Sequence, residues 1–259
     1  MSLITKNILI FFSFKLLVLV AVVSCVSLTY LNEIDGILTA YEVTIAVIAN
    51  PYYVTFISLP FLIFMIYKLQ NDYSIYMIIR FKKIRNYIYI QFISIFIIIS
   101  IYVIIQILVV IMITRAVLPH QNIFLFMNQS VDLTQTVFDS LKIYSYYNET
   151  PLIALFKLAG YMIFGMYISS ILFYIVINTF SKKIVLIIQI IEYMGMIVAV
   201  HSIDQYNNII GYLFINNYFI LHFGYNYNIN HMLEIMLLTI IILVIYLNTY
   251  LNKNVKVEY

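Results

Sequence analysis

Four polar side chains stand inside long apolar runs, where a charged or amide group needs a partner or water. They are Lys15, Gln106, Asn178 and Glu192. Because ionisable groups are costly in hydrocarbon, such residues usually face protein or a water-filled path. Glu192 could line a conduit or contact a cationic ligand; it could also pack as a protonated carboxyl or pair with Lys15. Lys15 could instead extend its long side chain toward a membrane surface.

A second group of interest is the basic stretch at residues 69–85. Asp72 stands near its start, as suits a helix N-terminus, and its basic side chains gather near the end. These are Arg80, Lys82, Lys83 and Arg85. A short helix at a membrane surface fits the pattern, held by anionic lipid or by a protein partner. The stretch is too short and too close to an apolar run to indicate nucleic-acid binding.

Signatures of enzyme chemistry are missing from the chain. His231 and Glu234 stand three residues apart, but no H-E-x-x-H motif and no obvious third ligand accompany them, so no metal site is predicted. None of the six glycines is followed by lysine, so the phosphate-binding motif G-x-x-x-x-G-K-[ST] is absent, as is G-x-S-x-G. We therefore expect no catalytic residue and no cofactor in this chain.

The composition excludes an ordinary soluble protein. The chain is 64% hydrophobic and 10% charged, with a mean hydropathy of +1.00, whereas soluble domains are about a quarter charged. Its 259 residues leave little room for a soluble domain beside several membrane spans, so one transmembrane domain, 1–259, is predicted. Tyrosine is abundant and tryptophan is absent, which favours tyrosine in the interfacial positions. The single Cys25 cannot form an internal disulfide.

Six apolar runs are long enough to cross a bilayer as helices, because lipid leaves a backbone no other hydrogen-bond partners. The predicted spans are 8–30, 48–67, 87–114, 151–178, 184–200 and 232–251. The fold class is therefore all-α, a multi-pass membrane protein. Small residues in the fourth and fifth spans indicate close helix packing, within the subunit or across a dimer. They are Ala159, Gly160, Gly165, Ser169, Ser170, Gly195 and Ala199.

Basic residues set the orientation, because they concentrate in short cytoplasmic loops. With six spans and the N-terminus inside, ten of the fourteen fall on the cytoplasmic side. These are Lys6, Lys68, Arg80, Lys82, Lys83, Arg85, Lys182, Lys183, Lys253 and Lys256. Both termini are predicted to be cytoplasmic. The long connection 116–150 then lies outside, and the two short apolar pieces within 201–231 predict a re-entrant hairpin between spans five and six.

The basic loop and the start of the third span carry a family resemblance. The residues are Ile79, Arg80, Phe81, Lys82 and Lys83, followed by Tyr87 and Gln91. With the six-span topology they resemble the small ABC-2 type transporter permeases of low-GC Gram-positive bacteria. These are membrane subunits of bacteriocin, lantibiotic-immunity and peptide-toxin exporters. The chain is most similar to exporters of amphipathic cytolytic peptides of the staphylococcal type, although its outer connection 116–150 is longer than in many members.

The resemblance implies a function in the bacterial cell membrane. The chain would be the permease of an ATP-driven exporter of hydrophobic or amphipathic peptides. A cytoplasmic ABC ATPase would bind ATP and Mg²⁺ and dock on the coupling helix at 72–81. Within that helix we expect Asp72, Tyr76, Arg80 and Phe81 to transmit the motion.

The resemblance also implies a second permease subunit, identical or different, with spans one, two and five as the conduit wall. Glu192 and Lys15 are the predicted conduit residues. The alternative is a membrane immunity or sensor protein that binds a peptide without transporting it. That alternative shares the hydropathy but needs no ATPase.

Overall fold

The computed structural model describes residues 39–71, 84–117, 150–180, 182–202, 215–221 and 228–253, with single positions at 18, 22, 23, 25 and 225. The described residues are almost entirely helical and include no strand, which confirms the all-α class. The main elements are α2 (Ala40–Ile48), α3 (Pro51–Tyr53), η1 (Val54–Ser58), α4 (Leu59–Asn71), α6 (Ile84–Val117), α8 (Pro151–Thr179), α9 (Lys182–Ser202), η3 (Ile215–Tyr218) and α11 (Ile229–Lys253). Of these, η1 is a π-helix and η3 is a 3-10 helix.

Two helices are long and apolar enough to cross a membrane. They are Asn86–Val117 within α6 and Pro151–Ile177 within α8. A third candidate combines α2 with the helix that starts at Pro51, and the two halves meet at a bend of 52°. The predicted spans 87–114, 151–178, 184–200 and 232–251 each lie within a helix of the structure. The six-span count stays a prediction, because the described residues hold only two helices, or three with the bent pair, that are long and apolar enough to span. The first span at 8–30 also stays a prediction, because most of it lies outside the described residues.

Local capping fixes where two of these helices start. Thr39 caps α2: its hydroxyl accepts from the Glu42 N–H at 3.2 Å, and the Glu42 carboxylate accepts from the Thr39 N–H at 2.6 Å. Thr150 caps α8 by accepting from the Ile153 N–H, and proline follows at the first helical position. Such caps satisfy N–H groups that a helix start leaves open, which matters most away from water.

The second span differs from its prediction. It was expected to begin at residue 48 and run straight to 67, with the preceding residues in an outer loop. Instead, α2 precedes it, and the chain breaks at Ala49 and Asn50 before continuing through α3, η1 and α4. The Asn50 side chain caps the new helix by accepting from the N–H groups of Tyr52 and Tyr53, and Pro51 takes the first position. Asparagine and proline together explain the break.

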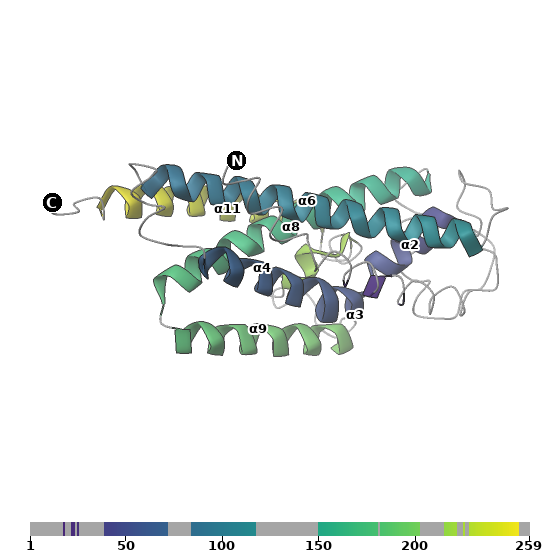
Figure 1. Ribbon diagram of the computed structural model, residues 1–259, viewed down its shortest axis with the longest axis horizontal. Coiled ribbons are helices and arrows are strands. Elements are labelled where there is room, and N and C mark those ends of the chain that lie inside the picture. Colours follow the sequence, from purple (N-terminus) through teal and green to yellow (C-terminus); the bar gives the residue numbers. More distant parts are fainter. Residues whose placement is uncertain are drawn as a thin grey trace.

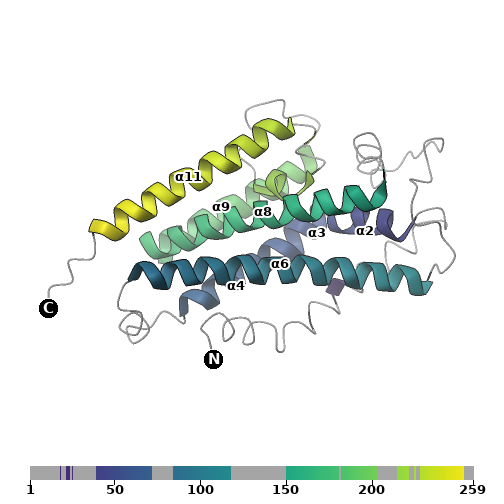
Figure 2. The ribbon, with the colours of Figure 1, turned by 90° about the horizontal axis from the view of Figure 1, so that it is seen from above.

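Helix α8 is the centre of the bundle. It packs against α2, α4, α6, α9, α11 and η3, while α6 packs mainly against α2 and α8. The long helices run side by side along the long axis of the molecule (Figures 1 and 2). The largest fully buried side chains include Tyr87, Tyr102 and Phe219. The core therefore forms along α6 and α8 and extends to the η3 segment.

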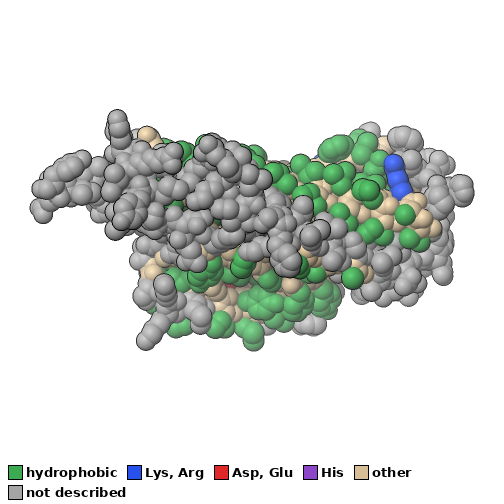
Figure 3. Space-filling view, viewed as in Figure 1, with side chains coloured by type: hydrophobic (Ala, Val, Ile, Leu, Met, Phe, Trp, Pro, Cys, Tyr) green, Lys and Arg blue, Asp and Glu red, His purple; other side chains and the backbone are tan. Residues whose placement is uncertain are grey.

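The exterior of the bundle is apolar and its interior contains polar groups. Large exposed apolar side chains follow α6, α9 and α11, for example Met112, Ile191 and Leu238. Figure 3 shows mostly hydrophobic side chains on the described part of one face, with Lys or Arg blue visible only toward the right. Buried polar residues include Thr55, Ser58, Gln106 and Ser170. An apolar surface over an interior with polar groups suits a protein surrounded by lipid.

Candidate functional site

Four uncharged polar side chains gather in the interior where the segment after the helix break meets α6. Tyr53 and Ser58 come from that segment, and Tyr102 and Gln106 come from α6. All four are buried, three of them fully. Tyr102 and Gln106 are four residues apart, which puts them on one face of α6. We call these four residues the polar cluster.

The polar cluster holds one direct hydrogen bond, which is long. The Tyr102 hydroxyl donates to the Ser58 hydroxyl at 3.4 Å. The Gln106 amide lies beside the hydroxyls of Tyr53 and Tyr102, but neither approach has the geometry of a regular hydrogen bond. Both polar atoms of the Gln106 amide and the Tyr53 hydroxyl lack a hydrogen-bond partner among the described residues. The polar cluster therefore has unused donors and acceptors.

The sequence creates this arrangement through the break and the π-helix. Pro51 starts the second half-helix, and the wider turn of Val54–Ser58 follows at once. A π-turn inserts one residue into a helix and is often found at functional positions. The ring of Phe61 on α4 stacks on the ring of Tyr102 on α6, and the two ring centroids are 3.7 Å apart. This stacking holds the tyrosine ring between α4 and α6. The geometry can present hydrogen-bonding groups to a neutral ligand.

The residues 215–221, between α9 and α11, pack into the interior of the helix bundle. The Tyr161 hydroxyl on α8 donates to the backbone carbonyl of Asn217 at 3.0 Å. Gly165 lies directly against the backbone of Tyr218, and Phe219 is fully buried. This contact uses one of the predicted small residues of the fourth span. Gly160, by contrast, faces open space.

Helix α9 packs against η1 and contacts α4 of the broken second span. The Tyr67 hydroxyl donates to the Gln189 side-chain oxygen at 3.1 Å, and Phe56 meets Tyr193 edge to face at 6.2 Å. Glu192, one residue before Tyr193, is half-buried and has neither an ion pair nor a hydrogen bond with any described residue. Its carboxyl is therefore available to a ligand or to a part of the chain that the structure does not describe.

The structure describes few of the predicted site residues. Glu192 lies on α9, and Gln106, also noted for its place in an apolar run, is fully buried on α6. The other predicted site residues lie outside the described part of the chain: Lys15, Asp72, Tyr76, Arg80 and Phe81. The pairing of Lys15 with Glu192 and the coupling helix at 72–81 stay predictions.

The sequence reasoning missed Tyr53, Ser58 and Tyr102. Tyrosines were expected at the membrane interfaces, whereas Tyr53 and Tyr102 are buried in the bundle. Two local signals could have revealed the broken helix: the pair Asn50-Pro51, and Thr39 three residues before Glu42 ahead of an apolar run. Together they predict a helix start on each side of the break.

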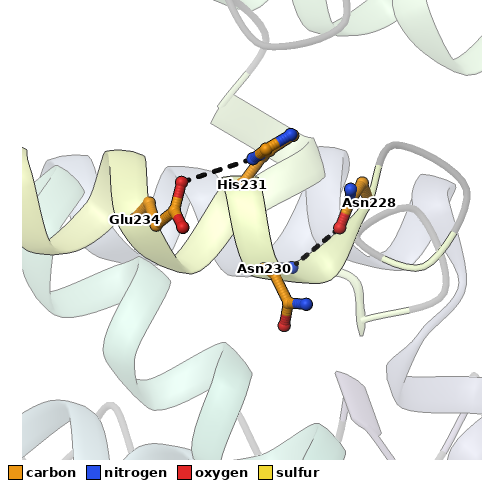
Figure 4. Close-up of polar contacts among 4 residues, drawn as sticks. All are labelled: Asn228, Asn230, His231 and Glu234. Atoms are coloured by element: carbon orange, nitrogen blue, oxygen red, sulfur yellow. Dashed lines mark hydrogen bonds and ion pairs between the residues drawn. The ribbon is translucent and has the colours of Figure 1, made fainter.

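The start of α11 carries the one ion pair among the described residues (Figure 4). Asn228, at a positive φ of 70°, accepts from the Asn230 N–H, and His231 contacts the Glu234 carboxylate at 3.3 Å. Both members of the pair are exposed. Within the described residues, no three His, Cys, Asp or Glu side chains lie together as metal ligands would. This pair is a surface contact at a helix start.

The interior offers two arrangements with chemical capacity: the uncharged polar cluster and the unpaired carboxyl of Glu192. Ser58 of η1 bonds to Tyr102 of the polar cluster, and α9, which carries Glu192, packs against η1. Both arrangements offer groups that a ligand could contact by hydrogen bonds or charge. No protein-family model matches this chain, and no curated protein or solved structure shows significant similarity to it.

Proposed function

We propose that this chain is the membrane-spanning permease subunit of an ATP-driven exporter of hydrophobic or amphipathic peptides. Six spans cross the bacterial cell membrane, both termini are cytoplasmic, and a re-entrant hairpin lies between spans five and six. A separate ABC ATPase binds ATP and Mg²⁺ and docks on the segment 72–81. A second permease subunit completes the conduit.

One observation supports this proposal most strongly: four helix ends with basic residues nearby in the sequence lie at one end of the bundle. Helix α4 ends at Asn71, α6 starts at Ile84, α9 starts at Lys182 and α11 ends at Lys253, and all four ends lie at the left in Figures 1 and 2. In the sequence, a basic residue stands within three residues of each of them, and Arg115 at the other end of α6 is the exception. Basic residues favour the cytoplasmic side.

The same geometry favours the coupling assignment. The segment 72–83 follows the end of α4 and precedes the start of α6 in the sequence, and both of these helix ends lie at this basic end. A partner that moves this segment can act on α4, which directly continues η1, and on α6, which carries Tyr102 and Gln106 of the polar cluster. ATP binding and hydrolysis would then shift the bundle between two conformations with different access to its interior.

Glu192 is the proposed contact for a cationic group of the peptide. It lies on α9, which borders η1 of the second span. A carboxylate that lacks a fixed ionic partner is free to pair with an incoming cation, and such a charge in a membrane helix is typically functional. Lys15 on the first span is the second proposed conduit residue.

Co-purification tests the proposal and separates it from the peptide-sequestering alternative. The tagged chain is expected to retain an ABC ATPase in stoichiometric amount, and a reconstituted complex should hydrolyse ATP faster when an amphipathic peptide is added. The double replacement Arg80→Ala with Phe81→Ala should abolish that stimulation while leaving the protein in the membrane.

A matched control is Lys182→Ala with Lys183→Ala, which removes two basic residues at the same end of the bundle and should preserve stimulation. Tight peptide binding without any ATPase in the preparation would favour sequestration. Stimulation that survives the change at 80 and 81 would reject these residues as the coupling contact.

A further inference from the structure

The Gln106 amide and the Tyr53 hydroxyl differ from most polar groups of the described helices. In seven described cases a Ser or Thr hydroxyl donates to the carbonyl four residues earlier, which satisfies it within its own helix. These are Thr44, Ser94, Ser100, Thr114, Ser169, Thr239 and Thr249. The Gln106 amide is fully buried, and neither of its polar atoms has a hydrogen-bond partner among the described residues. The buried Tyr53 hydroxyl beside it also lacks one.

The unused hydrogen-bonding capacity of the polar cluster is large for a protein interior. The Gln106 amide offers donors and an acceptor, and the Tyr53 hydroxyl can donate or accept. Leaving a buried polar group unpaired costs about 1–3 kcal/mol. These two side chains come from α6 and α3 and lie beside each other, so a single bound group can satisfy both at once.

We propose that the polar cluster is a binding site for a small neutral group that both donates and accepts hydrogen bonds. Two sources have this chemistry: a water molecule, and a backbone amide of the peptide cargo. The second source rests on the proposed export function, and the first does not. All four side chains of the cluster are uncharged, so a bound ion would have no compensating charge within it.

The position of the polar cluster connects it to a movable part of the fold. The 52° bend between α2 and α3 and the π-turn of η1 interrupt the second span directly beside it. Kinks and π-turns are the places where a helix changes direction with the least rearrangement. A change in this bend would open the cluster to a cargo amide, whereas a water molecule can occupy it in the closed bundle.

Radiolytic footprinting of the full chain in lipid nanodiscs tests the site directly. Hydroxyl radicals formed from a bound water oxidise the aromatic ring beside it, and mass spectrometry reads the oxidation residue by residue. Tyr102 is fully buried, and it is expected to oxidise several-fold faster than Tyr174, a buried tyrosine that packs against Phe92. Adding a synthetic amphipathic peptide of leucine and lysine separates the two sources.

Protection of Tyr102 by the peptide identifies a cargo amide as the occupant, and oxidation unchanged by the peptide identifies water. In both cases Gln106→Leu, and Tyr53→Phe, which removes the Tyr53 hydroxyl, should reduce Tyr102 oxidation to the Tyr174 rate. Thr114→Val is the matched control, because its hydroxyl already bonds within α6. Equal oxidation of Tyr102 and Tyr174 in the unmodified protein, with and without peptide, would overturn the proposal whatever the export assay shows.

Discussion

The backbone carbonyl of Tyr218 lies against Gly165 so closely that a Cβ atom at position 165 would overlap it. This contact brings η3 onto α8 and buries Phe219 in the bundle. Close approach of two backbones through a glycine is the usual means by which helical segments pack in membranes. The described part of the connection between α9 and α11 is thereby fixed to the central helix.

Gly165→Ala should weaken this packing. The added methyl group meets backbone rather than a flexible side chain, so relief requires displacement of η3, and overpacking of this kind costs about 1–3 kcal/mol. We expect a lower unfolding temperature in detergent, measured by fluorescence-detected size exclusion after heating. Gly160→Ala is the control: nothing lies within 4 Å of its Cβ position, so stability should stay the same or rise. Equal behaviour of the two variants would contradict the close packing.

Tyr161→Phe should remove a second link between α8 and η3. The lost hydrogen bond to the Asn217 carbonyl is expected to cost about 1 kcal/mol, since the ring itself still packs. The same heating assay measures the loss. Tyr41→Phe serves as the comparison, because the Tyr41 hydroxyl bonds to no described residue. A Tyr161→Phe protein as stable as the Tyr41→Phe protein would show that this bond contributes nothing.

Thr39→Ala should destabilise α2 by about 1 kcal/mol, because the first-turn N–H of Glu42 loses its acceptor. Thr39→Ser keeps the hydroxyl and should restore most of that stability. The readout is the midpoint of unfolding, compared among the three proteins. A Ser variant no better than the Ala variant would mean that the cap is not what holds the start of α2.

Glu192→Gln should leave stability unchanged and alter peptide preference. The carboxyl has no ionic partner among the described residues, so neutralising it breaks no pair that the structure contains. Under the proposed function, stimulation of ATP hydrolysis by a cationic peptide should weaken about tenfold relative to a neutral one, as expected for one lost charge contact. Glu234→Gln, at the exposed pair with His231, is the control and should keep the preference. An unchanged ratio in Glu192→Gln would exclude that residue from cargo contact.

The sequence predicted the long helices well because an apolar run in lipid has only one way to pair its backbone. The runs at 87–114 and 151–178 correspond closely to α6 and α8. The broken second span was not foreseen, because hydropathy alone treats 48–67 as one uniform helix and places Glu42 in a loop. The capping pair Thr39 and Glu42 was the available signal.

The polar cluster depends on tertiary contact, which hydropathy does not report. Tyr102 and Ser58 are 44 residues apart, and nothing in either segment indicates that they meet. Gln106 was identified from its position within an apolar run, since an amide there needs a polar neighbour. Its neighbours could be named only when α6 and η1 were placed side by side.

The central claim is that the segment 72–83 lies on the cytoplasmic side of the membrane. Cysteine labelling tests this claim most directly. With Cys25→Ser as background, Phe81→Cys and His120→Cys each provide a single thiol. A membrane-impermeant maleimide should label His120→Cys in intact cells, and it should label Phe81→Cys only after the cells are permeabilised. Labelling of Phe81→Cys in intact cells would contradict both the orientation and the docking of a cytoplasmic ATPase.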